Sequence, residues 1–117
     1  MTVTDIRDYC LSKKGATESL PFDDNVLVFK VVKMFALLPL DSFEKGEGSI
    51  NLKCDPDLAI ELREKYDFVL PGYHMNKSHW NTVKIVSQLS PNELKSWIDH
   101  SYDLIVSSLP KKLREDL

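Results

Sequence analysis

The sequence has 117 residues, of which 43% are apolar and 28% are charged, and its formal net charge is −3. This length and balance predict one globular domain, 1–117, with its own hydrophobic core, and they exclude a disordered chain. The negative net charge argues against a protein that coats nucleic acid non-specifically, since such proteins carry a strong basic surplus.

The chain shows no membrane or export signal. Its longest apolar-rich run, Met34 to Leu40, contains a proline and is far shorter than the roughly 20 residues that a membrane helix needs. The N-terminus lacks the basic start and apolar middle of a signal peptide, so we expect a cytoplasmic protein. Cys10 and Cys54 form no CxxC motif, which favours two partly buried thiols over a disulfide or a metal site.

The first third of the chain predicts a helix followed by a hairpin. Apolar residues recur at helical spacing from Val3 to Lys14, and Gly15 is a suitable stop. β-branched and aromatic residues then predict two antiparallel strands, Val26 to Val31 and Met34 to Leu40. Val32-Lys33 between them is poor chemistry for a tight hairpin turn.

The middle of the chain alternates between loop, strand and helix signals. The segment Asp41 to Gly48 is polar and contains glycine, so we expect a loop. Ser49 to Lys53 alternates as a third strand. Asp55-Pro56 caps a helix that runs to about Asp67.

The C-terminal part predicts two further strands and a long helix. Phe68 to Leu70 and Trp80 to Val86 are the strands, and Ser90-Pro91 begins the helix, which ends at Pro110. Lys111 to Leu117 adds one or two more turns. The fold class is therefore α+β, an antiparallel sheet in the order α-βββ-α-ββ-α with helices packed on one face.

Several strings, in this order and spacing, are typical of one family. The most distinctive is Asn76-Lys77-Ser78-His79-Trp80, and the others are Leu27 to Val31, Lys33 to Leu37, Asn51 to Pro56 and Asp99 to Leu104. Over essentially the whole chain they resemble the YjbR/MmcQ-like family of bacteria. Val31-Val32 departs from it, because relatives usually have a glycine-rich turn there.

This resemblance implies a fold and a function. The implied fold has the same element order and is similar to frataxin-like (CyaY-like) and secretion-chaperone-like folds. Members are also compared with double-wing DNA-binding domains, and the resemblance implies DNA binding on that comparison.

The segment His74 to Asn81 gathers two imidazoles, two amides, one ammonium and an indole beside a Pro-Gly break. One interpretation is a binding loop, in which Lys77 contacts a phosphate, Asn76 and Asn81 form hydrogen bonds through their amides, and Trp80 or Tyr73 offers a stacking surface. The other interpretation is structural. Asn76 and His79 would then satisfy backbone groups at the entry to the last strand, and Trp80 would pack in the core.

No catalytic or metal motif accompanies this segment. His74 and His79 are five residues apart, which suits neither one helix face nor one strand face as a metal pair. The sequence has no GxSxG, P-loop or GxGxxG motif. We therefore expect no enzymatic activity, no cofactor and no metal.

Two hypotheses for function remain open. The first is a module that binds duplex DNA through the region from Phe68 to Asn92, which contains no acidic residue. The second is a protein-interaction adaptor that offers a sheet face or edge to a protein partner. The candidate binding residues are Lys53, His74, Asn76, Lys77, His79, Trp80, Asn81 and Lys84.

Overall fold

Six strands pair in the order β1-β2-β3-β4-β6-β5, and every neighbouring pair is antiparallel. The computed structural model describes all residues, 1–117. The strands are β1 (Thr17–Ser19), β2 (Val26–Val31), β3 (Lys33–Pro39), β4 (Ser49–Lys53), β5 (Val69–Pro71) and β6 (Trp80–Lys84).

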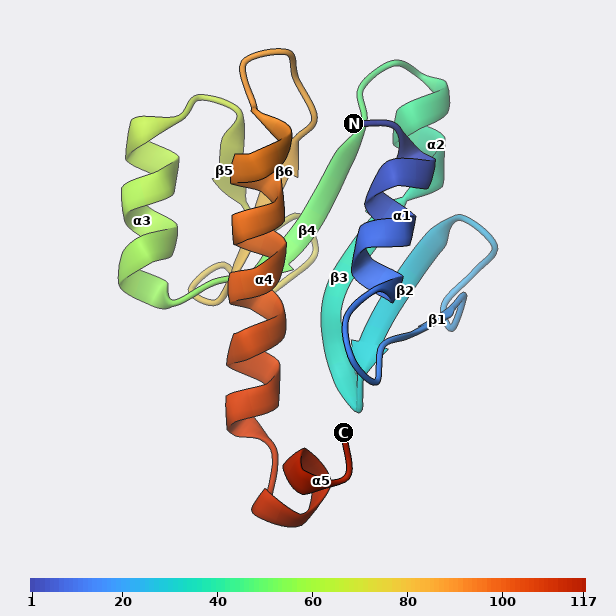
Figure 1. Ribbon diagram of the computed structural model, residues 1–117. Helices are drawn as coiled ribbons and strands as arrows, with labels where there is room; N and C mark the ends of the chain where they lie inside the picture. The colour runs from blue at the N-terminus through green and yellow to red at the C-terminus, as the bar shows by residue number, and fades with distance from the viewer.

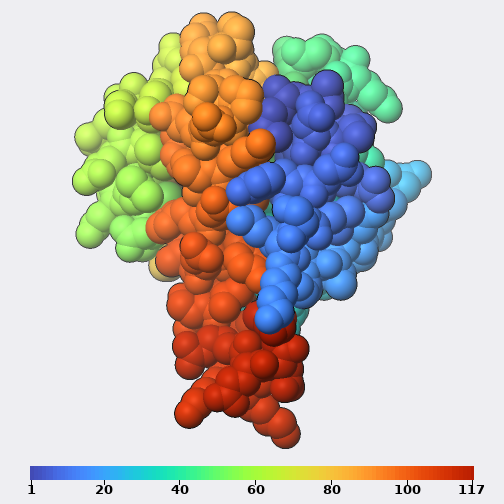
Figure 2. All heavy atoms as spheres, in the orientation of Figure 1, coloured from blue at the N-terminus to red at the C-terminus, as the bar shows by residue number.

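The main helices form a layer over one face of this sheet. The helices are α1 (Val3–Leu11), α2 (Leu40–Glu44), α3 (Pro56–Lys65), α4 (Pro91–Ser108) and α5 (Lys111–Glu115). Figure 1 shows α1, α3 and α4 in front of the sheet, and no helix lies across its other face. Seen from the helix side, atoms of this layer hide the central strands (Figure 2). The predicted α+β class is confirmed. None of the helices is long and apolar enough to cross a membrane.

Capping residues fix where the helices of this layer begin. The Thr2 hydroxyl accepts a hydrogen bond from the Asp5 N–H, and the Asp5 carboxylate accepts one from the Thr2 N–H, which makes a capping box for α1. Asp55 caps α3 and Ser90 caps α4, each with a proline in the first turn. The predicted starts of α3 and α4 are confirmed.

The main core lies between the helix layer and the sheet. Its largest fully buried side chains are Phe29 and Phe35 on the hairpin, whose rings lie 6.4 Å apart. Tyr102 of α4 meets the Phe35 ring edge-on at 5.5 Å. Such tilted and edge-on aromatic pairs add to the stabilisation from apolar burial.

One buried hydroxyl ties α4 to two strands. Ser101 is fully buried, donates to the Phe35 carbonyl at 2.5 Å and accepts from the Lys53 N–H at 2.9 Å. Both backbone groups lie where β3 and β4 do not pair with each other, because their register covers only residues 36–37 and 51–52. Ser101 therefore completes hydrogen bonds that the sheet leaves open.

Two elements were missed in the sequence. β1 is short, polar and paired with a single neighbour, so it has no hydrophobic periodicity to detect. α2 forms inside the segment Asp41 to Gly48 that was predicted to be a loop, and this prediction was wrong. Asn25 stabilises its start, because the Asn25 carbonyl and side-chain oxygens accept from the Leu40 and Asp41 N–H groups. Such a long-range cap is invisible to local sequence patterns.

Candidate functional site

The face of the sheet opposite the helices, called here the open face, carries polar side chains. On β4, Ile50 and Leu52 point into the core, so strand alternation places Ser49, Asn51 and Lys53 on the open face. This alternation of apolar and polar positions explains how one five-residue strand serves both a core and a solvent-facing surface.

Strand β6 extends the same surface. Its Trp80, Thr82 and Lys84 pair with Lys53, Asn51 and Ser49 of β4, so all of these side chains lie on the open face. Trp80 is 9% exposed and packs on Val28 and Leu37 in a small second hydrophobic cluster. The open face is thus apolar beneath Trp80 and polar along the rest of β4 and β6.

Charge is divided between the two faces. The charged strand residues on the open face are Lys30, Lys53 and Lys84, and none of the strand residues on this face is acidic. Glu18 on β1 pairs with Phe29 on the helix side, where its carboxylate accepts from the Arg7 guanidinium of α1 at 2.5 Å. Within the sheet, the open face therefore has the more positive potential.

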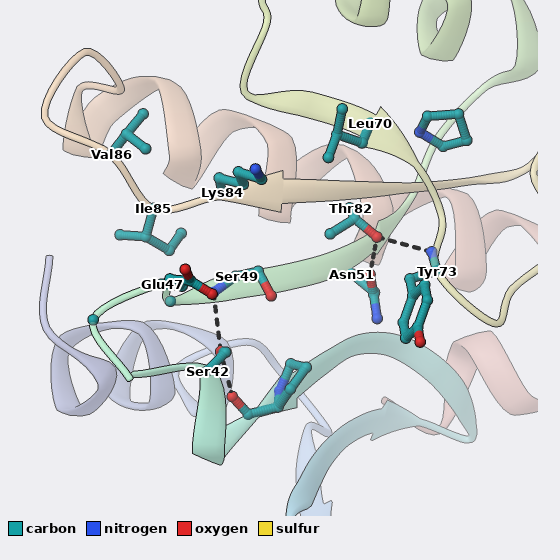
Figure 3. Close-up of a pocket in the computed structure, with 14 residues that line it drawn as sticks. Ser42, Glu47, Ser49, Asn51, Leu70, Tyr73, Thr82, Lys84, Ile85 and Val86 are labelled. Atoms are coloured by element: carbon teal, nitrogen blue, oxygen red, sulfur yellow. Dashed lines mark hydrogen bonds between the residues drawn. The ribbon is translucent and has the colours of Figure 1, made fainter. Parts of the chain in front are cut away.

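A groove of about 540 Å³ lies on the open face, lined by 14 residues (Figure 3). Asn51 and Thr82 form its floor, and Tyr73, in the loop after β5, stands at one end beside the Asn51 amide. Glu47 and Lys84 lie toward the other end. This volume lies within the range of small-molecule binding sites, about 300 to 1,000 Å³.

A chain of hydrogen bonds orders the groove floor. The Thr82 hydroxyl accepts from the Tyr73 N–H at 2.9 Å and donates to the Asn51 Oδ1 at 2.5 Å. Asn51 is 8% exposed, and its hydrogen bond to Thr82 uses the Oδ1, not the Nδ2. The groove therefore offers an ordered amide donor beside an aromatic ring.

The segment predicted as a binding loop is held mainly by its own backbone. The Asn76 carbonyl accepts from the N–H groups of His79 and Trp80, and the Asn76 Oδ1 accepts from the Ser78 N–H at 2.9 Å. The His79 carbonyl accepts from the Cys54 N–H at 2.8 Å. Asn76 and His79 thus have structural contacts at the entry to β6, although His79 makes its contact through the carbonyl and its imidazole is exposed.

Lys77 and His74 are exposed and lie in the same loop. The Lys77 ammonium donates to the Gly72 carbonyl at 2.9 Å, so it is partly engaged within the protein. His74 has a φ of 58° and its ring packs against the Tyr73 ring, with the centroids 4.0 Å apart. Neither His74 nor Lys77 lines the groove. The structure does not bring the two histidines and Lys77 together in one cleft.

Asn81 was predicted as a binding residue, and this prediction is corrected for the open face, because the Asn81 side chain is not available to a ligand there. It is 2% exposed and alternates with Trp80, so it points to the helix side, where its Nδ2 lies 3.4 Å from the Ala59 carbonyl. Trp80 is buried in the second cluster rather than exposed for stacking. Lys53 and Lys84 are the two predicted residues that lie on the open face with solvent access.

Several residues that line the groove were not predicted from the sequence to form a site. Asn51, Thr82 and Ser49 are ordinary polar residues, and only the pairing of β4 with β6 brings them together. The alternation of Ser49 to Lys53 was a signal that could have located them, since it places every second residue on one face.

The cysteines are structural, as predicted. Both are free and buried, and burial raises the pKa of Cys10 to about 12 and that of Cys54 to about 11. No cluster of three or more His, Cys, Asp and Glu side chains is present that could hold a metal ion.

The fold and groove define a class of small α+β domains in which helices cover one face of an antiparallel sheet and the other face stays open. The sequence model of the YjbR family matches residues 11–104. The chain belongs to the YjbR family. This finding confirms the family resemblance of the sequence motifs.

Individual relatives agree with this assignment. The uncharacterized protein YjbR of Escherichia coli (strain K12) is 31% identical over 115 residues, which cover 98% of this chain and 96% of YjbR. The uncharacterized protein YbdF of Escherichia coli O157:H7 is 38% identical over 93 residues, 79% of this chain and 74% of YbdF.

Solved structures share the fold. The crystal structure of protein DR2400 from Deinococcus radiodurans superposes with a TM-score of 0.90 at 34% identity, covering 98% of this chain and 86% of that one. A crystal structure of a protein from Pseudomonas syringae gives 0.75 at 31% identity, covering 89% of this chain and 98% of the other. The overall fold is thus shared by chains of about one-third identity.

Proposed function

We propose that the protein binds duplex DNA through the open face of its sheet. The observation that supports this proposal is the division of charge. Lys30, Lys53 and Lys84 are the charged strand residues on the open face, whereas the one acidic strand residue, Glu18, lies on the helix side and the other acidic residues stand on helices and loops. A phosphate backbone is attracted to a local surplus of lysines even when the net charge of the protein is negative.

The spacing of two lysines supports the same function. Lys53 and Lys84 lie at opposite ends of the β4–β6 pair, four residues apart in register. Four residues of an extended strand span about 13 Å, which is close to the about 12 Å width of the B-DNA major groove. The backbones of the two lysines are therefore spaced on the scale of that groove, which supports contacts of their flexible side chains with phosphates on its two sides.

The test is a fluorescence anisotropy titration of a labelled random-sequence duplex at about 50 and about 200 mM salt. Three phosphate contacts predict a slope of about −2.7 in the logarithmic salt plot, so the affinity should fall about 40-fold between these concentrations. Lys53→Ala and Lys84→Ala should each weaken binding at low salt and reduce the slope by about 0.9. Lys77→Ala should have a smaller effect, because its ammonium is engaged with the Gly72 carbonyl.

Lys111→Ala is the matched control. Lys111 is exposed on α5 and pairs with Glu115 at 3.8 Å, away from the open face. It should leave both the affinity and the slope unchanged. Absence of binding at 50 mM salt, or equal losses from Lys111→Ala and Lys84→Ala, would contradict DNA binding through this face.

A protein partner is the second candidate function. Leu20 and Phe22, just after the edge strand β1, are 47% and 64% exposed. Exposed apolar side chains beside an unpaired strand edge are typical of a surface that adds a partner strand. In a pull-down from cell extract, one protein recovered stoichiometrically by the wild type and lost with Phe22→Ser would favour this function over DNA binding.

A further inference from the structure

The end of the groove at Tyr73 combines an exposed aromatic ring with an ordered amide. Tyr73 is 70% exposed even though His74 packs against it. Tyr73 precedes the left-handed His74, and its own N–H is fixed by the Thr82 hydroxyl, so its backbone is held at the groove mouth. An exposed tyrosine held in this way costs little entropy when it stacks on a ligand.

Asn51 supplies the polar group next to that ring. Its Oδ1 accepts from Thr82, which turns the Nδ2 away from the β6 strand and leaves it without a protein acceptor. Figure 3 shows the Tyr73 ring standing beside this amide. A flat ligand placed against the ring can therefore present an edge acceptor to the Asn51 Nδ2.

The residues that line this end of the groove carry no charge. Lys84 and Glu47, the two charged lining residues, are both at the opposite end, so the lining around Tyr73 and Asn51 is uncharged. Lys53 lies two residues beyond Asn51 on the same face, outside this lining. Leu70, 38% exposed, adds apolar contact from β5. These surroundings suit a neutral, flat, hydrogen-bonding group, and a nucleobase has all three properties.

We infer that this end of the groove holds one unpaired nucleobase of a DNA strand, stacked on Tyr73 and accepting a hydrogen bond from the Asn51 Nδ2. The inference rests on the proposed function, because lysines of the open face would hold the adjoining phosphates. It adds a preference for DNA that contains an unpaired base. In an intact duplex each base is covered on both faces by its neighbours, so stacking on Tyr73 requires an unpaired or extruded base.

The experiment compares four labelled ligands at about 50 mM salt. They are a fully paired duplex, the same duplex with one bulged nucleotide, the single strand, and a free nucleoside monophosphate. The wild type should bind the bulged duplex and the single strand more tightly than the paired duplex. The free nucleotide should bind weakly, because it lacks the neighbouring phosphates; if it binds as tightly as the strand, the site takes a free nucleotide and the inference about strand DNA is overturned.

Two variants of Tyr73 separate stacking from structure. Tyr73→Leu removes the ring from an exposed position and should weaken binding of the bulged duplex about 5- to 150-fold, the range for loss of one base–aromatic stack. Tyr73→Phe keeps the ring and should bind within about twofold of the wild type. Asn51→Asp keeps the acceptor for Thr82 but removes the donor, so it should also weaken the bulged duplex more than the paired one.

The outcomes distinguish this inference from the proposed function. Equal binding of paired and bulged duplexes, unaffected by Tyr73→Leu but weakened by Lys84→Ala, overturns the base site and keeps the DNA-binding face. Binding of the bulged duplex and single strand that depends on Tyr73, with no binding of the paired duplex, supports the base site and overturns duplex binding. No binding of any of the four ligands overturns both.

Discussion

The two faces of the sheet differ in what their side chains contribute. On the helix side, β3 and β4 bury Ala36, Leu38 and Ile50 completely in one large core. On the open face, the same two strands carry Leu37 in a small cluster and Asn51 in the groove. Because the helix side supplies most of the apolar burial, the open face can carry polar and charged groups without a large loss of stability. The separation of stability from surface chemistry within single strands is what allows a domain this small to carry a polar groove.

The largest expected effect comes from neighbouring leucines on β3 that point to opposite faces. Leu38→Ala leaves a cavity in the main core and should lower the free energy of unfolding by about 4 kcal/mol, within the range for a buried leucine. Leu37→Ala, on the open face, should cost about 2 kcal/mol, because the small cluster is closer to solvent. Urea unfolding of both variants measures the difference. Equal losses would mean that the open-face cluster stabilises the fold as strongly as the main core.

The next effect tests how the helix layer is attached to the sheet. Ser101→Ala leaves the Phe35 carbonyl and the Lys53 N–H without their partner, and we expect a loss of about 2 kcal/mol. Ser107→Ala is the control, because this exposed hydroxyl donates only to the Leu104 carbonyl within α4. The control should stay within about 0.5 kcal/mol of the wild type in the same urea titration. If Ser107→Ala loses as much unfolding free energy as Ser101→Ala, the hydrogen bonds of the buried Ser101 hydroxyl have no special role in stability.

The sequence predicted the helix side better than the open face, for a physical reason. Helix starts and apolar strands follow local rules, so Asp55-Pro56 and Ser90-Pro91 located α3 and α4 correctly. The groove depends on the pairing of β4 with β6, which joins segments about thirty residues apart in the chain. The motif segment around Asn76 attracted attention through its unusual composition, yet its main contacts hold a turn.

The β2–β3 turn shows where a local rule correctly signalled an unusual conformation. Val32 was expected to suit a tight turn poorly, and it adopts a φ of 68°, which is strained for a β-branched residue. It is 55% exposed and belongs to neither face of the sheet, so its substitution tests the backbone alone. Val32→Gly should raise the free energy of unfolding by about 1 kcal/mol, since relief of strain outweighs the added freedom of the unfolded chain.

The measurement is thermal unfolding of Val32→Gly beside Lys33→Gly, whose position is also exposed but lies within β3. Lys33→Gly should be destabilised, because glycine weakens a strand. If Val32→Gly is also destabilised, contacts of the valine side chain stabilise the turn by more than its backbone strain costs. The substitution would then not report on the backbone alone.

The smallest expected effect concerns a polar contact on the outer side of the helix layer. The Asp99 carboxylate of α4 accepts from the Tyr9 hydroxyl of α1 at 2.5 Å and pairs with the Lys13 ammonium. Partial burial would raise the pKa of Asp99, but the hydrogen bonds from Lys13 and Tyr9 outweigh burial and hold this pKa below its ordinary value. A carboxyl whose pKa is lowered by folding stabilises the protein above its unfolded pKa, about 3.9, and this contribution disappears as the pH falls through the folded value.

Asp99→Asn should therefore be less stable than the wild type by a constant amount between about pH 5 and 7, and the difference should shrink below about pH 4. Because the Asp99 side chain is 40% exposed, solvent screening limits the difference to about 1 kcal/mol or less. Asp103→Asn, which removes an exposed carboxylate without an ion pair from the same helix, provides the reference curve. A difference for Asp99→Asn that persists at low pH would show that shape and hydrogen bonding, rather than charge, join α1 to α4.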